Sequence, residues 1–411
     1  MYGDFALDWY VPRTIEKLVQ KIRNQFPALV ISGPRQSGKT TLIRHLFKDT
    51  HNFVTFDDPL NRERALSDPQ LFLENLAPNM ILDEIQYVPK ILSYIKIMID
   101  QDRNTYGRFI LSGSQQFHLI KNLGDSLAGR VAILNLLPFD WQERKSALGE
   151  RFLLNTRDHF EFCALRGSFP ELVIHPEKDV SIWYGSYLQT YLERDVRFLE
   201  NVGDLFNFQR FIRLLASRCG QILNLSSFSK ELGISVSTVK RWLSILQAGK
   251  MIYLLQPYHR NQGKRITKNP KVYFLDLGLV SYLTGVTGKE ILFNGPLAGA
   301  MFENFIIQEI IKLFVNKGKQ PPLYYLRTNN QLEVDLIIEK RYDQIIPVEI
   351  KLARTLNSGM ARPIERLKNL FDELPFTQGF LVSLNEENFP LTRNVRSVPF
   401  ESFLQELAAD L

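Results

Sequence analysis

The stretch of sequence that decides the fold is Gly33-Pro34-Arg35-Gln36-Ser37-Gly38-Lys39-Thr40. It follows the apolar segment Ala28–Ser32, which has the pattern of a buried strand, and it leads into the helical pattern of Lys39–Phe47. A glycine-rich loop between a strand and a helix turns backbone N–H groups toward bound phosphate, and the helix N-terminus favours the same negative charge. The spacing of glycines, lysine and threonine in this context predicts a phosphate loop for a nucleotide.

The side chains of this loop have separate expected roles. Lys39 is expected to reach the β- and γ-phosphates, and Thr40 to bind Mg²⁺. The residues expected to contact ATP are the whole loop and the next threonine: Gly33, Pro34, Arg35, Gln36, Ser37, Gly38, Lys39, Thr40 and Thr41.

An acidic pair at the end of the apolar strand Met80–Asp83 completes the predicted site. We expect Asp83 to hold Mg²⁺ through water and Glu84 to polarise the attacking water. Such strand ends often only cap a loop, but behind a phosphate loop this one indicates catalysis. No guanine-reading NKxD segment is present, which favours ATP over GTP.

Two further positions are candidates for the reaction. Ser114 and Gln115 follow another apolar strand, so either residue could orient water or sense the γ-phosphate, unless the segment is only a polar turn. Arg130 precedes the fifth strand pattern; it is either a surface residue or an arginine that reaches a γ-phosphate, most naturally that of a neighbouring copy.

Composition limits the remaining possibilities. The 411 residues are 45% hydrophobic and 23% charged, which excludes wholesale disorder. The net charge of +6 permits a nucleic-acid partner without demanding one. Cys163 and Cys219 form no CxxC pair, so a disulfide framework and a cysteine zinc site are not expected. With neither a signal peptide nor an apolar stretch long enough to span a bilayer, we expect a cytoplasmic protein without a membrane partner.

Alternating strand and helix patterns in the first third predict an α/β fold, a parallel sheet with helices on both faces. A helical stretch follows, then a mixed segment and a final α/β segment. We therefore expect four domains: an ATPase core (1–145), a helical lid (146–220), a helix-turn-helix region with a wing (221–290) and a C-terminal domain (291–411).

The third segment has the pattern of a winged helix. Gly233 permits a tight turn between two short helices, and Ser235 caps the second. Eight Lys or Arg and no Asp or Glu lie between Lys240 and Lys271, a balance that suits contacts with DNA phosphates. The residues expected to face a groove are Ser235, Ser237, Thr238 and Arg241. The alternative is a protein-binding or purely structural module.

The last segment carries a set of carboxylates. Residues two apart on a strand share a face, so Glu333 pairs with Asp335 and Glu349 with Lys351. Two neighbouring strands would gather Asp335, Glu349 and Lys351 around Mg²⁺, with Glu303 as a third carboxylate from the preceding helix. The alternative is a pair of solvated charges at a sheet edge.

The chain as a whole resembles the prokaryotic AAA-type ATPases that are fused to a C-terminal domain of unknown function. Besides the phosphate loop, the resemblance rests on residues 82–86 (LDEIQ), 111–114 (LSGS), 126–130 (SLAGR), 166–171 (RGSFPE) and 191–195 (YLERD). Gly167-Ser168 stands where the family usually has two glycines. The resemblance implies ATP and Mg²⁺ as cofactors and makes Arg194 and Asp195 candidates in the lid.

The segment from Gly295 onward is similar to the PD-(D/E)xK nuclease superfamily, which implies a restriction-endonuclease-like α/β domain. Asp335, Glu349 and Lys351 match its motif, with Val334 in place of the motif's proline. Three functions stay open: an ATPase that acts on nucleic acid through the winged helix and nuclease-like domain, a regulatory or scaffolding ATPase that binds proteins, or a binding protein that never hydrolyses ATP. Homo-oligomerisation is compatible with both.

Overall fold

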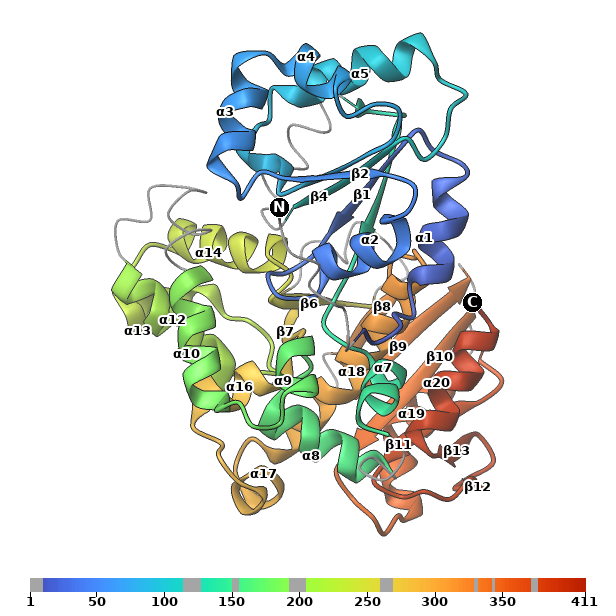
Figure 1. Ribbon diagram of the computed structural model, residues 1–411. Coiled ribbons are helices and arrows are strands. Elements are labelled where there is room, and N and C mark those ends of the chain that lie inside the picture. Colours follow the sequence, from blue (N-terminus) through green and yellow to red (C-terminus); the bar gives the residue numbers. More distant parts are fainter. Residues whose placement is uncertain are drawn as a thin grey trace.

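A computed structural model of the protein describes residues 10–113, 127–149, 155–191, 205–258, 269–328, 332–341, 344–370 and 376–411. The first part of the chain forms the upper lobe in Figure 1, and the remainder forms a larger lower lobe. The elements of the upper lobe are α1 (Glu16–Arg23), β1 (Ala28–Ser32), α2 (Lys39–Phe47), β2 (Asn52–Thr55), α3 (Pro59–Ser67), α4 (Pro69–Glu74), β3 (Met80–Asp83), a 3₁₀ turn (Ile85–Tyr87), α5 (Ile91–Gln101), β4 (Phe109–Gly113) and β5 (Val131–Asn135).

The five strands of the upper lobe form a parallel sheet in the order β2-β3-β4-β1-β5. Alternate residues of β1 enter two different cores. Leu29 and Ile31 pack with α1 and α2, whereas Val30 packs on the other face with α3, α4 and α5. The predicted sheet with helices on both faces is therefore present, and it brings the carboxyl ends of β1, β3 and β4 to one edge.

The lower lobe begins with helices. They are α7 (Trp141–Leu148), α8 (Thr156–Arg166), α9 (Pro170–Ile174), α10 (Val180–Tyr191), α12 (Leu205–Ser217), α13 (Leu225–Leu232), α14 (Val236–Ala248), α16 (Leu277–Thr284), α17 (Lys289–Asn294) and the long α18 (Ala298–Asn316). Aromatic side chains fill the space between them; the Trp242 ring on α14, for example, lies 5.2 Å from that of Phe208 on α12.

A second, mixed sheet of eight strands runs in the order β12-β13-β11-β10-β9-β8-β6-β7. Its strands and the accompanying helices are β6 (Ile252–Pro257), β7 (Lys271–Phe274), β8 (Leu323–Arg327), β9 (Glu333–Arg341), β10 (Gln344–Lys351), a 3₁₀ turn (Ser358–Ala361), α19 (Arg362–Leu370), β11 (Gly379–Ser383), β12 (Phe389–Pro390), β13 (Val395–Val398) and α20 (Phe400–Ala409). The β6–β7 hairpin joins the C-terminal strands because β6 pairs with β8.

Among the described residues the lower lobe has two hydrophobic cores, and the larger one extends through most of the lobe. It contains side chains from Leu137 to Leu407 and includes residues of α8, α12, α14, β7, α18 and β10. This core therefore includes residues from each of the three segments expected after residue 145. Within the described ranges, no helix is long and apolar enough to cross a membrane.

Candidate functional site

The phosphate loop has the backbone of a tight cradle. Gly33 and Gly38 have φ angles of 150° and 90°, which favour glycine at both positions. A Cβ atom at Gly33 would lie 2.1 Å from the carbonyl oxygen of Leu136, so a larger residue would collide with the backbone after β5. The loop is thus held between β1 and β5 and opens at the start of α2.

Lys39 lies folded back on its own loop. Its Nζ donates hydrogen bonds to the carbonyl oxygens of Gly33 at 3.1 Å and Pro34 at 2.8 Å. The hydroxyl of Ser37 is buried and has no hydrogen-bond partner among the described residues. A lysine ammonium and an unsatisfied hydroxyl inside a glycine loop fit an anionic ligand, so these residues fit the expected phosphate group.

The predicted magnesium residues lie together. Thr40 Oγ1 donates to Asp83 at 3.0 Å, and Ser112 at the end of β4 also donates to Asp83. Burial raises the pKa of Asp83, and the hydrogen bond from Ser112 opposes that rise. The next residue, Glu84, has φ 55° and accepts a hydrogen bond from Gln86. The hydroxyl and carboxylate oxygens suit Mg²⁺, which prefers oxygen ligands.

Sequence reasoning missed Arg13, which reaches the loop from the segment before α1. Its guanidinium donates to the carbonyl oxygens of Ser37 at 2.8 Å and Leu137 at 2.7 Å, and it forms an ion pair with Glu143 at 3.0 Å. No motif surrounds Arg13, so no signal in the sequence marked it.

The expected segment 166–171 also approaches the loop, since a Cβ at Gly38 would lie 3.8 Å from Pro170.

Arg130 and the phosphate loop lie at opposite ends of the strands. Arg130 directly precedes β5, whose first residue pairs with the first residue of β1, whereas the loop follows the last residue of β1. Its guanidinium pairs with Asp100 at 2.7 Å. Within one chain Arg130 is therefore far from the phosphates, and a role for it needs a second copy. Ser114, Gln115, Arg194 and Asp195 lie outside the described residues.

The C-terminal residues predicted from adjacent strands do converge. Lys351 Nζ lies 3.0 Å from Asp335 Oδ2 and 2.7 Å from Glu349 Oε2. The backbone N–H of Ile350 donates to the same Asp335 oxygen at 2.9 Å. Glu349 is 1% exposed, and its Oε1 atom has no hydrogen-bond partner among the described residues. Burial, followed by the charge of Asp335, raises the pKa of Glu349 to about 8. An orphaned buried carboxylate oxygen fits a cation such as Mg²⁺.

Glu303 is engaged elsewhere in the same region. It accepts hydrogen bonds from the Tyr273 hydroxyl and from Lys271, whose Nζ lies 3.3 Å away. In the part of the chain that the structure describes, no three His, Cys, Asp or Glu side chains lie close enough to hold a metal together. The expected third carboxylate is thus satisfied by a lysine and a tyrosine, which corrects the prediction of a three-carboxylate metal site that includes Glu303.

The helix-turn-helix pattern is also present as α13 and α14. Gly233 has φ 68°, and the Ser235 hydroxyl accepts the N–H of Thr238 at 3.1 Å. Ser235, Ser237, Lys240 and Arg241 are exposed, and Thr238 is half-buried. Lys271, which we counted with the phosphate-contacting cations, is only 4% exposed and lies in the carboxylate cluster. Residues 259–268, with four of the eight basic residues, lie outside the described ranges.

Comparison with protein families divides the chain in three. Residues 25–145 match the model of an AAA domain. Residues 157–290 and 298–403 match two models that are each described as a domain of unknown function (DUF8612 and DUF4143). The first match and the loop geometry agree, so the chain carries an AAA-type P-loop ATPase domain.

Two mycobacterial relatives extend along nearly the whole chain. The "uncharacterized protein Rv2008c" of Mycobacterium tuberculosis and the "uncharacterized protein Mb2031c" of Mycobacterium bovis are each 28% identical to it over 395 residues, which is 95% of this chain and 84% of each relative. Among solved structures, the Walker-type ATPase PABY2304 of Pyrococcus abyssi covers 66% of this chain and 94% of its own, with 15% identity and a TM-score of 0.44. The RuvB Holliday junction branch migration motor of Thermotoga maritima covers 60% and 91%, with 15% identity and a TM-score of 0.31.

Proposed function

Because residues 25–145 form an AAA domain, we propose that this chain binds ATP with Mg²⁺ and hydrolyses it where β1, β3 and β4 end. The observation that carries the proposal is the contact between Thr40 and Asp83 at 3.0 Å, beside Lys39 and Glu84. These four residues have the chemistry that phosphoryl transfer to water needs: a lysine for the phosphates, two oxygen ligands for the metal and a carboxylate for the water.

The proposed reaction assigns each side chain one task. ATP draws Lys39 away from the carbonyl oxygens of Gly33 and Pro34 and onto its own phosphates. Thr40 and Asp83 would hold Mg²⁺, which would neutralise charge on the β- and γ-phosphates. Glu84 then orients a water molecule and accepts its proton as the bond to the γ-phosphorus forms and the bond to the leaving ADP oxygen breaks. The Arg130 guanidinium would stabilise this transition state only in a neighbouring copy.

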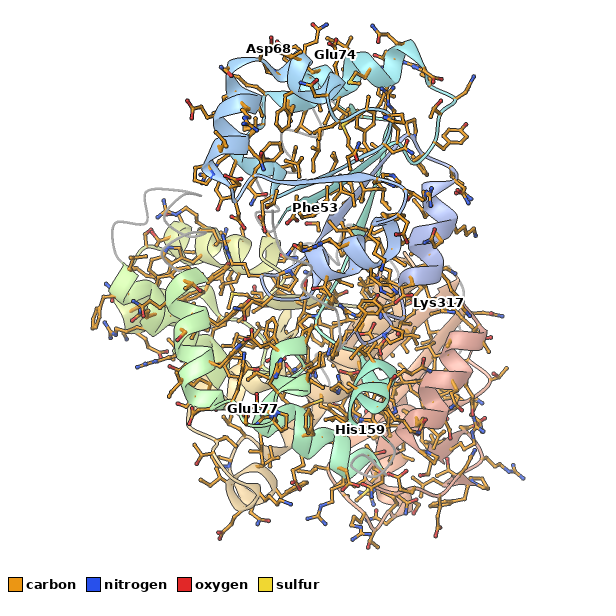
Figure 2. The ribbon with its side chains drawn as sticks, in the orientation of Figure 1. Phe53, Asp68, Glu74, His159, Glu177 and Lys317 are labelled. Atoms are coloured by element: carbon orange, nitrogen blue, oxygen red, sulfur yellow. The ribbon has the colours of Figure 1, made fainter. Side chains whose placement is uncertain are left out.

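The test is phosphate release with Mg²⁺ and ATP, measured together with ATP affinity by calorimetry. Lys39→Ala should lose ATP binding, and Glu84→Gln should keep binding while turnover falls by about 100-fold or more, the order expected of a lost general base. Glu74→Gln is the matched control, since Glu74 is exposed on α4 and lies at the top of the upper lobe in Figure 2. Turnover in Glu84→Gln equal to that of the wild type contradicts the proposal.

A second candidate function is metal-dependent cleavage of nucleic acid in the lower lobe. It is favoured by the contact of Lys351 with both Asp335 and Glu349 and by the orphaned Oε1 atom of Glu349. In this proposal the two carboxylates hold the metal that polarises a phosphodiester and prepares water, and Lys351 stabilises the developing charge. The exposed start of α14 would contact the DNA. This candidate combines the ATP site, the winged helix and a nuclease-like domain in one chain.

Plasmid and single-stranded DNA with Mn²⁺ or Mg²⁺ test the second candidate. Cleavage should occur with the wild type, disappear with Glu349→Gln and persist with Glu387→Gln, a substitution of an exposed glutamate in the same lobe. Intact DNA with the wild type would contradict the nuclease hypothesis and favour the hypothesis of a regulatory or scaffolding ATPase.

A further inference from the structure

A lysine from outside the C-terminal segment enters the carboxylate cluster. Lys271 begins β7, within the residues matched by the 157–290 family model, whereas Glu303, Asp335, Glu349 and Lys351 lie within the 298–403 match. Its Nζ lies 3.3 Å from Glu303 and 2.9 Å from Glu333, and its charge also acts on Asp335. The cluster is therefore built by two sequence segments together.

Burial makes Lys271 an internal cation and not a surface lysine. The residue is 4% exposed, and its Nζ lies 5.5 Å from the centroid of the Tyr325 ring. Neighbouring groups hold Glu303, the partner of Lys271, in place. The Tyr273 hydroxyl donates a hydrogen bond to Glu303, and the next residue, Asn304, forms hydrogen bonds with both the N–H and the carbonyl oxygen of Phe274. An ammonium removed from water in this way is retained only where carboxylates offset its desolvation.

The formal charge of the cluster depends on Lys271. We call Glu303, Asp335, Glu349, Lys271 and Lys351 the inner cluster. Above the raised pKa of Glu349, which is about 8, Glu303, Asp335 and Glu349 carry three negative charges, and Lys271 and Lys351 carry two positive ones, which leaves −1. Glu333 lies at the rim, where Arg327 is 3.8 Å away and adds an opposing charge. Without Lys271 the inner cluster would carry −2 and would attract a divalent cation more strongly.

We propose that Lys271 is a built-in counter-cation that neutralises the Glu303 side of the cluster, so that a divalent ion is confined to Asp335 and Glu349. This inference rests on the second candidate function for the identity of the site, but not on DNA cleavage. It makes Lys271 a positioning residue, because it acts on the metal through Glu303 and Asp335.

Titration of nucleotide-free protein with Mn²⁺, followed by electron paramagnetic resonance at mildly alkaline pH, tests the proposal. Lys271→Met should lower the Kd for Mn²⁺ by at least about tenfold, since an added negative charge within the cluster attracts the ion. Lys271→Arg should stay near the wild type. Lys340→Met is the matched control, because Lys340 on β9 pairs with Asp410 at a half-exposed site. An unchanged or higher Kd in a folded Lys271→Met variant overturns the proposal, and so does absence of binding in both the wild type and this variant.

A paired substitution covers the case in which Lys271→Met does not fold. Glu303→Gln lowers the negative charge and should weaken Mn²⁺ binding by at least about tenfold, whereas Lys271→Met with Glu303→Gln restores the charge and should return the Kd to near the wild-type value. Equal Kd values for Glu303→Gln and the double variant overturn the proposal. Mn²⁺ binding that follows these charges in a protein that leaves DNA intact would refute cleavage and leave the role of Lys271 standing.

Discussion

Arg13 Nη1 donates a hydrogen bond to the carbonyl oxygen of Ser37 over 2.8 Å, so a residue before α1 holds the middle of the phosphate loop. The same guanidinium binds the chain after β5 through Leu137 and α7 through Glu143. A loop that presents its N–H groups to phosphate depends on the orientation of the peptide units between them, and Arg13 fixes the unit that precedes Gly38. The residue thereby connects the loop to the first helix of the lower lobe.

Replacement of Arg13 should weaken ATP binding. We expect Arg13→Ala to raise the Kd for ATP by about tenfold, equivalent to about 1.4 kcal/mol, because the loop loses its fixed conformation and the ligand must order it. The Kd of Arg13→Lys for ATP should lie between those of the wild type and Arg13→Ala. Calorimetric titration with ATP measures the effect, and Arg103→Ala is the control, since the Arg103 side chain is 64% exposed. A folded Arg13→Ala variant with wild-type affinity would show that this contact serves the fold alone.

Most of the upper lobe could be predicted from sequence because its signals are local. The segments Ala28–Ser32, Lys39–Phe47 and Met80–Asp83 are found with the predicted bounds. Each is a continuous apolar or amphipathic run, and the phosphate loop itself fixes the order of strand and helix. Asp83 and Thr40 were expected to share a ligand, and they lie 3.0 Å apart.

What the sequence did not predict depends on contacts between distant residues. The pairing of β6 with β8 joins residues 256 and 324, and nothing in the sequence of either strand indicates which strand it pairs with. Lys271 lies in a segment whose composition predicted a basic wing, yet its burial follows from the position of Glu303 on α18. Arg13 contacts Ser37 and Leu137, which lie 24 and 124 residues away. Side chains with such partners are recognisable only once the sheets are assembled.

The stability of the lower lobe should fall as the pH rises. Burial raises the pKa of Glu349 to about 8 from an ordinary value of 4.5, so the folded chain keeps a proton that the unfolded chain releases. The contribution of this group is complete below about pH 4.5 and is lost as the pH rises through about 8, with a slope of up to about 1.4 kcal/mol per pH unit.

Urea unfolding between pH 6 and 8.5 in the presence of a chelator measures this slope. Glu349→Gln cannot ionise, so its stability should depend less on pH than that of the wild type over this range. Parallel pH profiles for the two proteins would contradict the assignment of the raised pKa to Glu349.

A buried ion network between α7 and α18 leads to a further prediction. Arg144 is fully buried, lies 3.1 Å from Glu309 on α18 and donates to the carbonyl oxygen of Phe139 at 2.7 Å. Lys312 binds Glu309 as well, at 2.9 Å. Arg144→Met should lower the free energy of unfolding by about 3–5 kcal/mol, because part of the buried Glu309 charge loses its partner.

The neighbouring lysine is the control for this network. Lys145 pairs with Glu401 at 3.1 Å, but both side chains are about a third or more exposed. Lys145→Met should therefore cost at most about 1 kcal/mol. Urea denaturation of both variants compares the two positions, and losses of similar size would show that the Arg144 network is no stronger than a surface pair.

Binding to duplex DNA is the last prediction, and it concerns the exposed start of α14. Arg241 lies one helical turn from Thr238 on a surface that also presents Ser235 and Ser237. If this surface contacts phosphates, affinity must fall with salt because bound counterions are released, and removal of one arginine should lower the logarithmic slope by about one. Fluorescence anisotropy at several salt concentrations should show weaker, less salt-dependent binding for Arg241→Ala. Lys289→Ala on α17, at the bottom of Figure 1 and away from α14, should bind as the wild type does. An affinity indifferent to salt would assign α13 and α14 to a protein partner or to the fold.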